Sequence, residues 1–187
     1  MRAVGVISRL PKWIAIPGIL TAAALAMQIP AGAGGPSTSV QTEYLMSVHA
    51  LLAPPQAVDQ SLLIVGIPAG GWVEGPRIKG KIIGTSGDWL RVMPSGILRL
   101  DVRMTIQTDD NELIFTSYNG VIQCSKEQSD RLNAGEELKA GDCHFIAAPT
   151  YETKSEKYGW MNAVQAVEKM TSLKGGDHID LDVFAVK

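Results

Sequence analysis

The sequence predicts an all-β protein folded as a single closed antiparallel β-barrel of about nine strands, with one or two short helical turns. Two observations support this. Apolar and polar residues alternate with a period of two along most of the chain, and turn-forming residues recur at short intervals. A meander of this many strands leaves two exposed edges unless the sheet closes, and a closed sheet of about eight strands encloses an interior that can hold a small ligand.

The expected strands follow the runs of alternating polarity. They are Thr42–Ala53, Ser61–Ile67, Trp72–Ile83, Asp88–Met93, Leu98–Gln107, Leu113–Gln123, His144–Glu152, Asn162–Glu168 and His178–Val186. Glycines from Gly84 to Gly87 are expected to bend the chain at a barrel corner. Asp109-Asp110-Asn111 predicts a hairpin turn. Short helical turns are expected around Ser129–Leu132 and Glu156–Trp160.

The N-terminal segment has the layout of an export signal. A basic head is followed by an apolar, alanine-rich stretch that ends in the small-x-small pattern Ala31-Gly32-Ala33, which signal peptidase accepts. We expect a signal peptide over 1–33 with cleavage near Ala33, a flexible mature start over 34–41 and a barrel domain over 42–187. The predicted location is periplasmic or secreted. The alternative is a membrane anchor formed by an uncleaved N-terminal segment.

Composition limits the partners. Removing the signal peptide takes away Arg2, Arg9 and Lys12 but none of the 19 acidic residues, so the mature chain carries a formal charge of about −5. Nucleic acid is therefore not an expected partner, nor is a membrane once the signal has been cleaved. The mature length suits one domain. The sequence is also compatible with a homo-oligomer.

Cys124 and Cys143 bracket the polar loop 125–142 in a chain that we expect to be exported, where a disulfide is permitted. A bridge and two unlinked thiols on neighbouring strands are both compatible with the sequence. Three histidines, His49, His144 and His178, have no metal-ligand spacing, so no metal site is expected. The chain contains no nucleotide-binding fingerprint, and no cofactor is expected.

Several short motifs resemble, in the same order, the bacterial and fungal family called domain of unknown function 3237. They include Val73–Gly80, Gly87-Asp88-Trp89, Asp101-x-Arg103, Tyr118-Asn119-Gly120 and Trp160-Met161-Asn162. The resemblance runs from about Glu43 to Val186. It implies an antiparallel barrel related to calycin-like and allene-oxide-cyclase-like barrels, and it assigns no biochemical role. The chain departs from the family in its N-terminal signal and in the turn before Asp88.

The candidate catalytic residues are Asp101, Arg103, Asp88 and Glu152. Asp101 and Arg103 share one strand face, so inside a barrel the carboxylate could move a proton while the guanidinium holds a carboxylate or enolate. The alternative is a solvated ion pair on the outside. Asp88 could act at a barrel rim or cap a turn. Glu152 could be an acid or base, or a solvated strand end.

The candidate ligand-binding residues are Trp89, Tyr118, Asn119, Trp160 and Asn162. Tyr118 and Asn119 are adjacent in one strand, so only one of them can point inward. We expect a small organic molecule in the lumen. The protein would then be a cofactor-independent acid/base enzyme (an isomerase, cyclase or lyase) or a non-catalytic periplasmic carrier. Two titratable groups at one cavity favour the enzyme, and a single polar anchor favours the carrier.

Overall fold

The structure is a computed structural model that describes residues 39–187. The predicted signal peptide over 1–33 and most of the predicted mature start over 34–41 lie outside the described residues. Between residues 39 and 187, no helix combines the length and the apolar character needed to cross a membrane.

The described chain consists mainly of strands. They are β1 (Thr42–Leu51), β2 (Gln56–Ala57), β3 (Leu62–Ile67), β4 (Trp72–Gly75), β5 (Ile78–Val92), β6 (Leu98–Thr108), β7 (Leu113–Gln123), β8 (Leu138–Lys139), β9 (His144–Ala147), β10 (Thr150–Glu152), β11 (Ala166–Lys174) and β12 (His178–Val186). One α-helix, α1 (Lys126–Asn133), and one 3₁₀-helix (Gly159–Ala163) interrupt them in this part of the chain.

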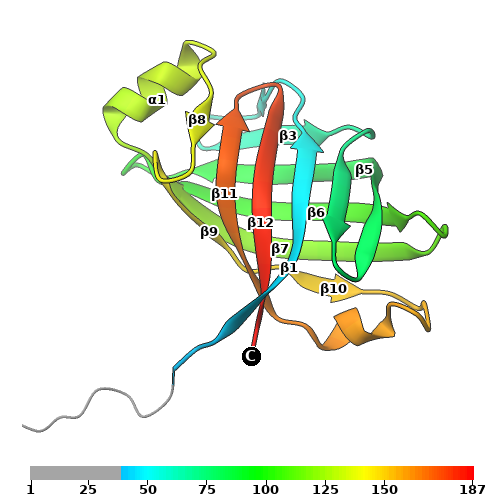
Figure 1. The fold of residues 1–187 in the computed structure, drawn as a ribbon. Coiled ribbons are helices and arrows are strands. Elements are labelled where there is room, and N and C mark those ends of the chain that lie inside the picture. Colours follow the sequence, from blue (N-terminus) through cyan, green and yellow to red (C-terminus); the bar gives the residue numbers. More distant parts are fainter. Residues whose placement is uncertain (1–38) are drawn as a thin grey trace, which may run out of the picture. The chain divides into compact units, whose positions relative to one another are not determined.

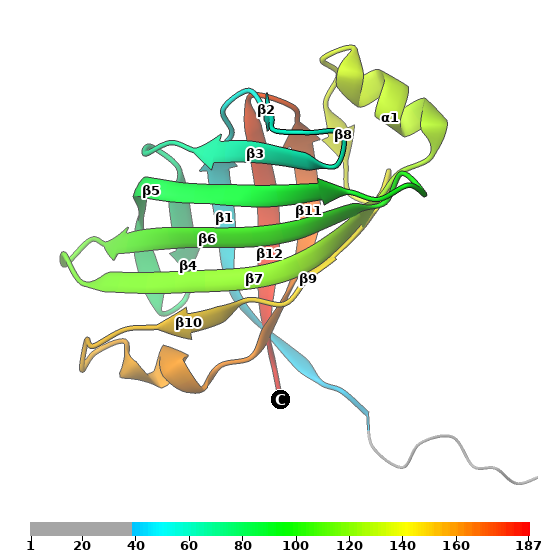
Figure 2. The same cartoon turned by 180° about the vertical axis from the view of Figure 1, so that it is seen from behind.

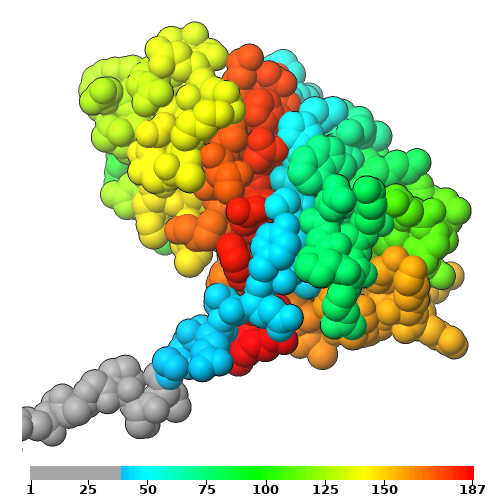
Figure 3. Space-filling view, viewed as in Figure 1, coloured from blue at the N-terminus to red at the C-terminus, as the bar shows by residue number. Residues whose placement is uncertain are grey.

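Eight of the strands close into an antiparallel ring. The order around it is β1, β4, β5, β6, β7, β9, β11 and β12, and β12 pairs with β1 again. Strands β2, β3, β8 and β10 extend the sheet at its margins. In Figure 1, β5, β6 and β7 cross steeply behind β1, β11 and β12, and in Figure 2, seen from the other side, they lie in front of them. The space-filling view in Figure 3 shows β1, β12 and β11 side by side on the face turned to the reader in Figure 1. The predicted closed antiparallel barrel is confirmed, with a ring of eight strands where about nine were expected.

The predicted corner at Gly84–Gly87 is wrong, because β5 runs through it as one strand. The pairing of β5 with β6 shifts register between Ile83 and Gly87, and Thr85 adopts a φ of 66°. Two extra residues of β5 in this segment form a bulge, which bends a strand without ending it. Even-numbered residues of β5 face the interior on both sides of the bulge, so Asp88 lies on the same face of the strand as Ile82.

Three other expected strands differ from the prediction. The expected strand His144–Glu152 is divided at Ala148-Pro149 into β9 and β10. The expected strand Trp72–Ile83 is divided by a hairpin turn into β4 and the start of β5. The expected strand Asn162–Glu168 begins later, because Gly159–Ala163 forms the 3₁₀-helix and β11 starts only at Ala166. The helical turn expected near Ser129 is confirmed and extended to α1, whose N-cap Ser125 forms a capping box with Gln128.

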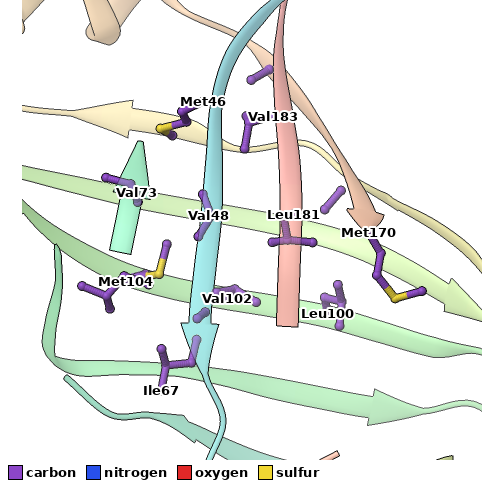
Figure 4. Packing of buried hydrophobic residues seen from close by; sticks show 14 of the residues in the cluster. Met46, Val48, Ile67, Val73, Leu100, Val102, Met104, Met170, Leu181 and Val183 are labelled. Carbon is purple, nitrogen blue, oxygen red and sulfur yellow. The ribbon is translucent and has the colours of Figure 1, made fainter. Parts of the chain in front are cut away.

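Inward-facing aliphatic side chains fill most of the barrel. Met46, Val48 and Val183 are almost fully buried, and Figure 4 shows them packed with side chains of the opposite wall such as Val102 and Met104. An eight-stranded ring has an interior just wide enough for such packing. Any ligand site inside the barrel must therefore lie where polar residues or a gap interrupt this apolar filling.

A disulfide joins Cys124 at the end of β7 to Cys143 at the start of β9, across a sequence separation of 19 residues. Replacing both cysteines with Ser should destabilise the protein by about 3 kcal/mol, because the unfolded chain gains the entropy of an open loop. For a domain of this size the loss corresponds to roughly 6–12 °C in Tm. Thermal unfolding of wild type in reductant provides the matched measurement, and an unchanged Tm in both proteins would contradict the prediction.

Candidate functional site

Asp101 and Arg103 lie on the outer face of β6. Leu100, Val102 and Met104 alternate with them and are buried inside the barrel, so the period of two directs the charged pair outward. The guanidinium of Arg103 lies 2.9 Å from the carboxylate of Asp101, with side-chain exposures of 49% and 43%. The placement in the lumen is therefore wrong, and the alternative, a solvated ion pair on the outside of the barrel, agrees with the structure.

Asp88 is the predicted catalytic carboxylate that does point inward. It follows the β5 bulge and is 8% exposed, and its Oδ1 accepts a hydrogen bond of 2.9 Å from the backbone N–H of Asp101. Burial raises the pKa of Asp88 to about 6, although that hydrogen bond opposes the shift, and the charge of Asp101 adds to it. At neutral pH this buried carboxyl is mainly ionised.

Glu168 is a second buried carboxyl, on β11. The residues that share its face, Ala166 and Met170, belong to the core, and Glu168 itself is 2% exposed. Within residues 39–187 its Oε2 has no hydrogen-bond partner. Burial raises the pKa of Glu168 to about 8, so the group is mainly protonated at neutral pH.

Two phenols lie beside these carboxyls. Tyr118 faces inward from β7, and Tyr151, which is 3% exposed, projects from β10 with a hydroxyl that has no partner in the described chain. Burial raises the pKa of Tyr118 well above its usual range, and the charges of Glu168, Asp88 and Tyr151 raise it further. Burial and Glu168 act in the same way on Tyr151. These four residues form what we call the acid–phenol cluster.

The strand register explains how residues distant in sequence meet in this cluster. Asp88 and Tyr118 both pair with Val102, from its two sides. Glu168 is joined through Ala147 of β9 to the position two residues beyond Tyr118 on β7. Tyr151 of β10 pairs with Thr116, two residues before Tyr118 on β7. The four side chains therefore come from neighbouring positions along the same strands of the barrel wall.

A cavity of about 760 Å³ opens at the end of the barrel that carries α1. Its mainly apolar lining includes Leu63, Leu90, Leu98, Ile122, Leu132 and Leu173. The four residues of the acid–phenol cluster are not in this lining, but Leu90 is the next residue on the inward face of β5 after Asp88, so the mouth cavity borders the cluster on the Asp88 side. The volume is within the range of small-molecule sites.

Two predicted ligand-binding residues face the other side of the sheet. Trp89 and Asn119 lie with Asp101 and Arg103 along a groove of about 330 Å³ on the outer surface. Asn119 donates a hydrogen bond of 3.1 Å to the carbonyl of Leu100. As expected from the strand period, only Tyr118 of the Tyr118-Asn119 pair points inward.

The remaining predicted residues lie outside both the cluster and the mouth cavity. Glu152 is exposed at the end of β10. The Trp160 ring packs 3.8 Å from the guanidinium carbon of Arg77. Asn162 accepts a hydrogen bond from the backbone N–H of Thr153 at 2.8 Å and donates one to its carbonyl at 2.9 Å, so it holds the loop before the 3₁₀-helix.

The sequence reasoning missed Glu168 and Tyr151. A usable signal existed for Glu168, because it occupies a core position of the alternating run Ala166-x-Glu168-x-Met170, where a charged residue is rare. It was overlooked because the expected strand ended at that residue. Among residues 39–187, no group of three or more His, Cys, Asp or Glu side chains is placed to hold a metal ion.

The family described as "Protein of unknown function (DUF3237)" matches residues 40–186. The chain belongs to this family. A UPF0311 protein of Clostridium acetobutylicum is 33% identical over 91 residues, which cover 49% of this chain and 58% of that protein. The match therefore spans less than two thirds of this relative's own length.

Solved structures share the fold of this DUF3237 member. A conserved protein of unknown function from Rhodopseudomonas palustris superimposes with a TM-score of 0.75 at 21% identity, over 81% of this chain and all of that one. The structure of an enzyme from Penicillium herquei matches with a TM-score of 0.62 at 22% identity, over 82% of this chain and 99% of that one. At these identities the likeness concerns the fold alone.

Proposed function

We propose that this protein is an exported, cofactor-independent acid/base enzyme that takes a small organic substrate through the mouth cavity to the acid–phenol cluster. The observation that carries the proposal is the fully buried carboxyl oxygen of Glu168, which has no hydrogen-bond partner in the described part of the chain. A buried polar atom without a partner costs stability, so its retention calls for a functional reason. The Penicillium herquei neighbour, described as an enzyme, is consistent with chemistry on this fold but does not specify the reaction.

The two carboxyls suit opposite roles. With a pKa of about 8, Glu168 holds a proton at neutral pH and acts as the general acid. With a pKa of about 6, Asp88 is mainly ionised and acts as the general base. Environments that separate two carboxyl pKa values in this way assign acid and base. The turnover rate should therefore peak between about pH 6 and pH 8.

A non-catalytic carrier is the second candidate, favoured by the apolar lining of the mouth cavity. A carrier needs the shape of the cavity but no proton transfer. The two candidates differ in what Glu168 does, since only the enzyme loses its chemistry when this carboxyl becomes an amide.

The test begins with the mature protein purified from its native host, followed by mass spectrometry of any small molecule that co-purifies. Leu173→Trp should deplete that molecule at least tenfold, because the indole would fill the mouth cavity. Leu113→Trp, at a side chain that is 49% exposed on β7, is the matched control and should retain it. If both variants retain the small molecule equally, it does not bind in the mouth cavity, and the proposed site is wrong.

The molecule recovered from wild type is then incubated with wild type and with Glu168→Gln. Conversion by wild type, with at least a hundredfold slower conversion by the variant, supports the enzyme. Removing a general acid typically slows the reaction by about 10²–10⁴-fold. Binding without conversion by either protein supports the carrier.

A further inference from the structure

The outer face of β5 and β6 carries more positive charge than its neighbours neutralise. Arg91 and Arg99 are exposed and directly opposite one another across the two strands. Like charges at such positions repel and destabilise the pairing. In the described part of the chain, no carboxylate lies within 4 Å of either guanidinium, whereas Arg103 is paired with Asp101.

These arginines line the outer groove of about 330 Å³, together with Trp89, Asp101 and Asn119. We call this surface the arginine groove. It lies on the wall of β3, β5, β6 and β7 that faces the reader in Figure 2. Three arginines and one aspartate give it a net positive charge in a chain whose net charge is −2.

An aromatic side chain borders the charged pair. Trp89 is 39% exposed, and its ring lies 5.3 Å from the guanidinium carbon of Arg103. The side chain of Asp101 is paired with Arg103, whereas Arg91 and Arg99 form no ion pair in the described residues. The pKa of Asp59 is lowered mainly by the backbone N–H groups of Ser61 and Leu62 and to a smaller extent by the charge of Arg91, so Arg91 is compensated only in part. A single ligand can therefore contact the guanidinium groups of Arg91 and Arg99 at one end of the groove and the indole of Trp89 at the other.

A second, mainly apolar trough of about 520 Å³ continues from the groove, as Arg99 and Asn119 line both. Val121 and Ile146 form part of its floor, and Ile146 is 41% exposed. The combined surface places two guanidinium groups next to apolar side chains. It is therefore complementary to a ligand that has one anionic end and an apolar body.

We propose that the arginine groove binds a small organic carboxylate with a planar apolar body. Guanidinium groups match a carboxylate through two parallel N–H···O hydrogen bonds. An anion between Arg91 and Arg99 would relieve their repulsion, while Trp89 and the apolar trough cover the rest of the ligand. The presence of Asp101 in the groove favours a monoanion over a dianion. This site faces away from the acid–phenol cluster and does not depend on the proposed catalysis.

The test is calorimetric titration of the full chain with 2-naphthoate as the probe. The neutral 2-naphthamide tests the need for charge, and inorganic phosphate tests the need for the apolar body. Binding of naphthoate at least tenfold tighter than of either comparison compound is the expected result. Equal affinity for naphthamide or for phosphate would overturn the proposal.

Arg91→Gln combined with Arg99→Gln should weaken naphthoate binding at least tenfold. Lys81→Gln combined with Lys154→Gln removes the same charge from exposed positions outside the groove and should change the affinity less than twofold. If both double variants lose the same affinity for naphthoate, the binding depends only on the net charge of the protein, and the proposed site is wrong. A change in sedimentation coefficient in the arginine variant alone would also overturn it, since a second copy of the chain would then cover the groove.

Discussion

Replacing Glu168 with Gln should stabilise the folded protein at pH 8 and leave its stability close to that of wild type at pH 5. The pKa of Glu168 is about 8 in the fold, against 4.5 for an unperturbed glutamate. Between these values the folded state holds a proton that the unfolded state has released, so the free energy of unfolding of wild type falls as pH rises. The slope reaches about 1.4 kcal/mol per pH unit.

The glutamine side chain stays neutral at every pH and so removes this slope. Below pH 4.5 the carboxyl is protonated in both states of wild type, and above pH 8 it is ionised in both, so the difference between the proteins builds up only between those limits. At pH 8 the variant should be more stable by an amount on the order of 4 kcal/mol. Urea unfolding at intervals between pH 5 and 8 measures it.

Glu152→Gln is the matched control, because Glu152 is exposed on β10 and forms no ion pair within residues 39–187. Its stability should follow the wild-type curve at every pH. The raised pKa of Asp88 contributes equally to all three proteins and cancels in the comparison. If wild type and Glu168→Gln keep a constant difference from pH 5 to 8, Glu168 is not a buried acid of raised pKa, and its proposed role fails.

The same substitution separates stability from activity. If Glu168 were retained for the fold, the amide would be neutral or harmful to both properties. If the carboxyl serves catalysis at a cost to stability, the variant gains stability while conversion of the substrate falls. Such a trade-off is typical of functional groups held in unfavourable surroundings.

The sequence was sufficient for the barrel but not for its interior. Period-two alternation depends only on the local backbone, so it predicted strands such as β6 and β7 and the hairpin between them correctly. The direction in which each face points depends on the curvature of the whole sheet. Asp101 and Arg103 were therefore placed on one face, as observed, but on the wrong side of the wall.

The bulge in β5 shows why local signals were ambiguous there. Gly84 and Gly87 suit both a corner between strands and an irregularity within one strand. Only the pairing of β5 with β6 beyond Gly87 distinguishes the two, and that pairing places Asp88 inside and Trp89 outside. The proximity of Tyr118 to Glu168 likewise depends on the pairing of β7, β9 and β11, which joins strands far apart in sequence.

Gly75→Ala should be the most damaging small substitution in the family-like segment Val73–Gly80. A Cβ at Gly75 would lie 2.1 Å from the carbonyl oxygen of Leu45 and 2.8 Å from the Cβ of Met46. Those atoms belong to β1, whose pairing with β4 helps to close the ring. The clash involves backbone and a core residue, so no flexible side chain can yield to it. We expect a loss of about 3 kcal/mol or more.

For a domain of this length, that loss lowers Tm by roughly 6–12 °C, which thermal unfolding measures directly. Gly84→Ala is the control, since a Cβ there has no atom within 4 Å, and its Tm should stay within about 2 °C of wild type. Both substitutions remove the same backbone freedom from the unfolded chain, so their difference isolates the contact between β4 and β1. Equal Tm values would mean that β1 can move away from β4, and that the ring is not held closed at Gly75.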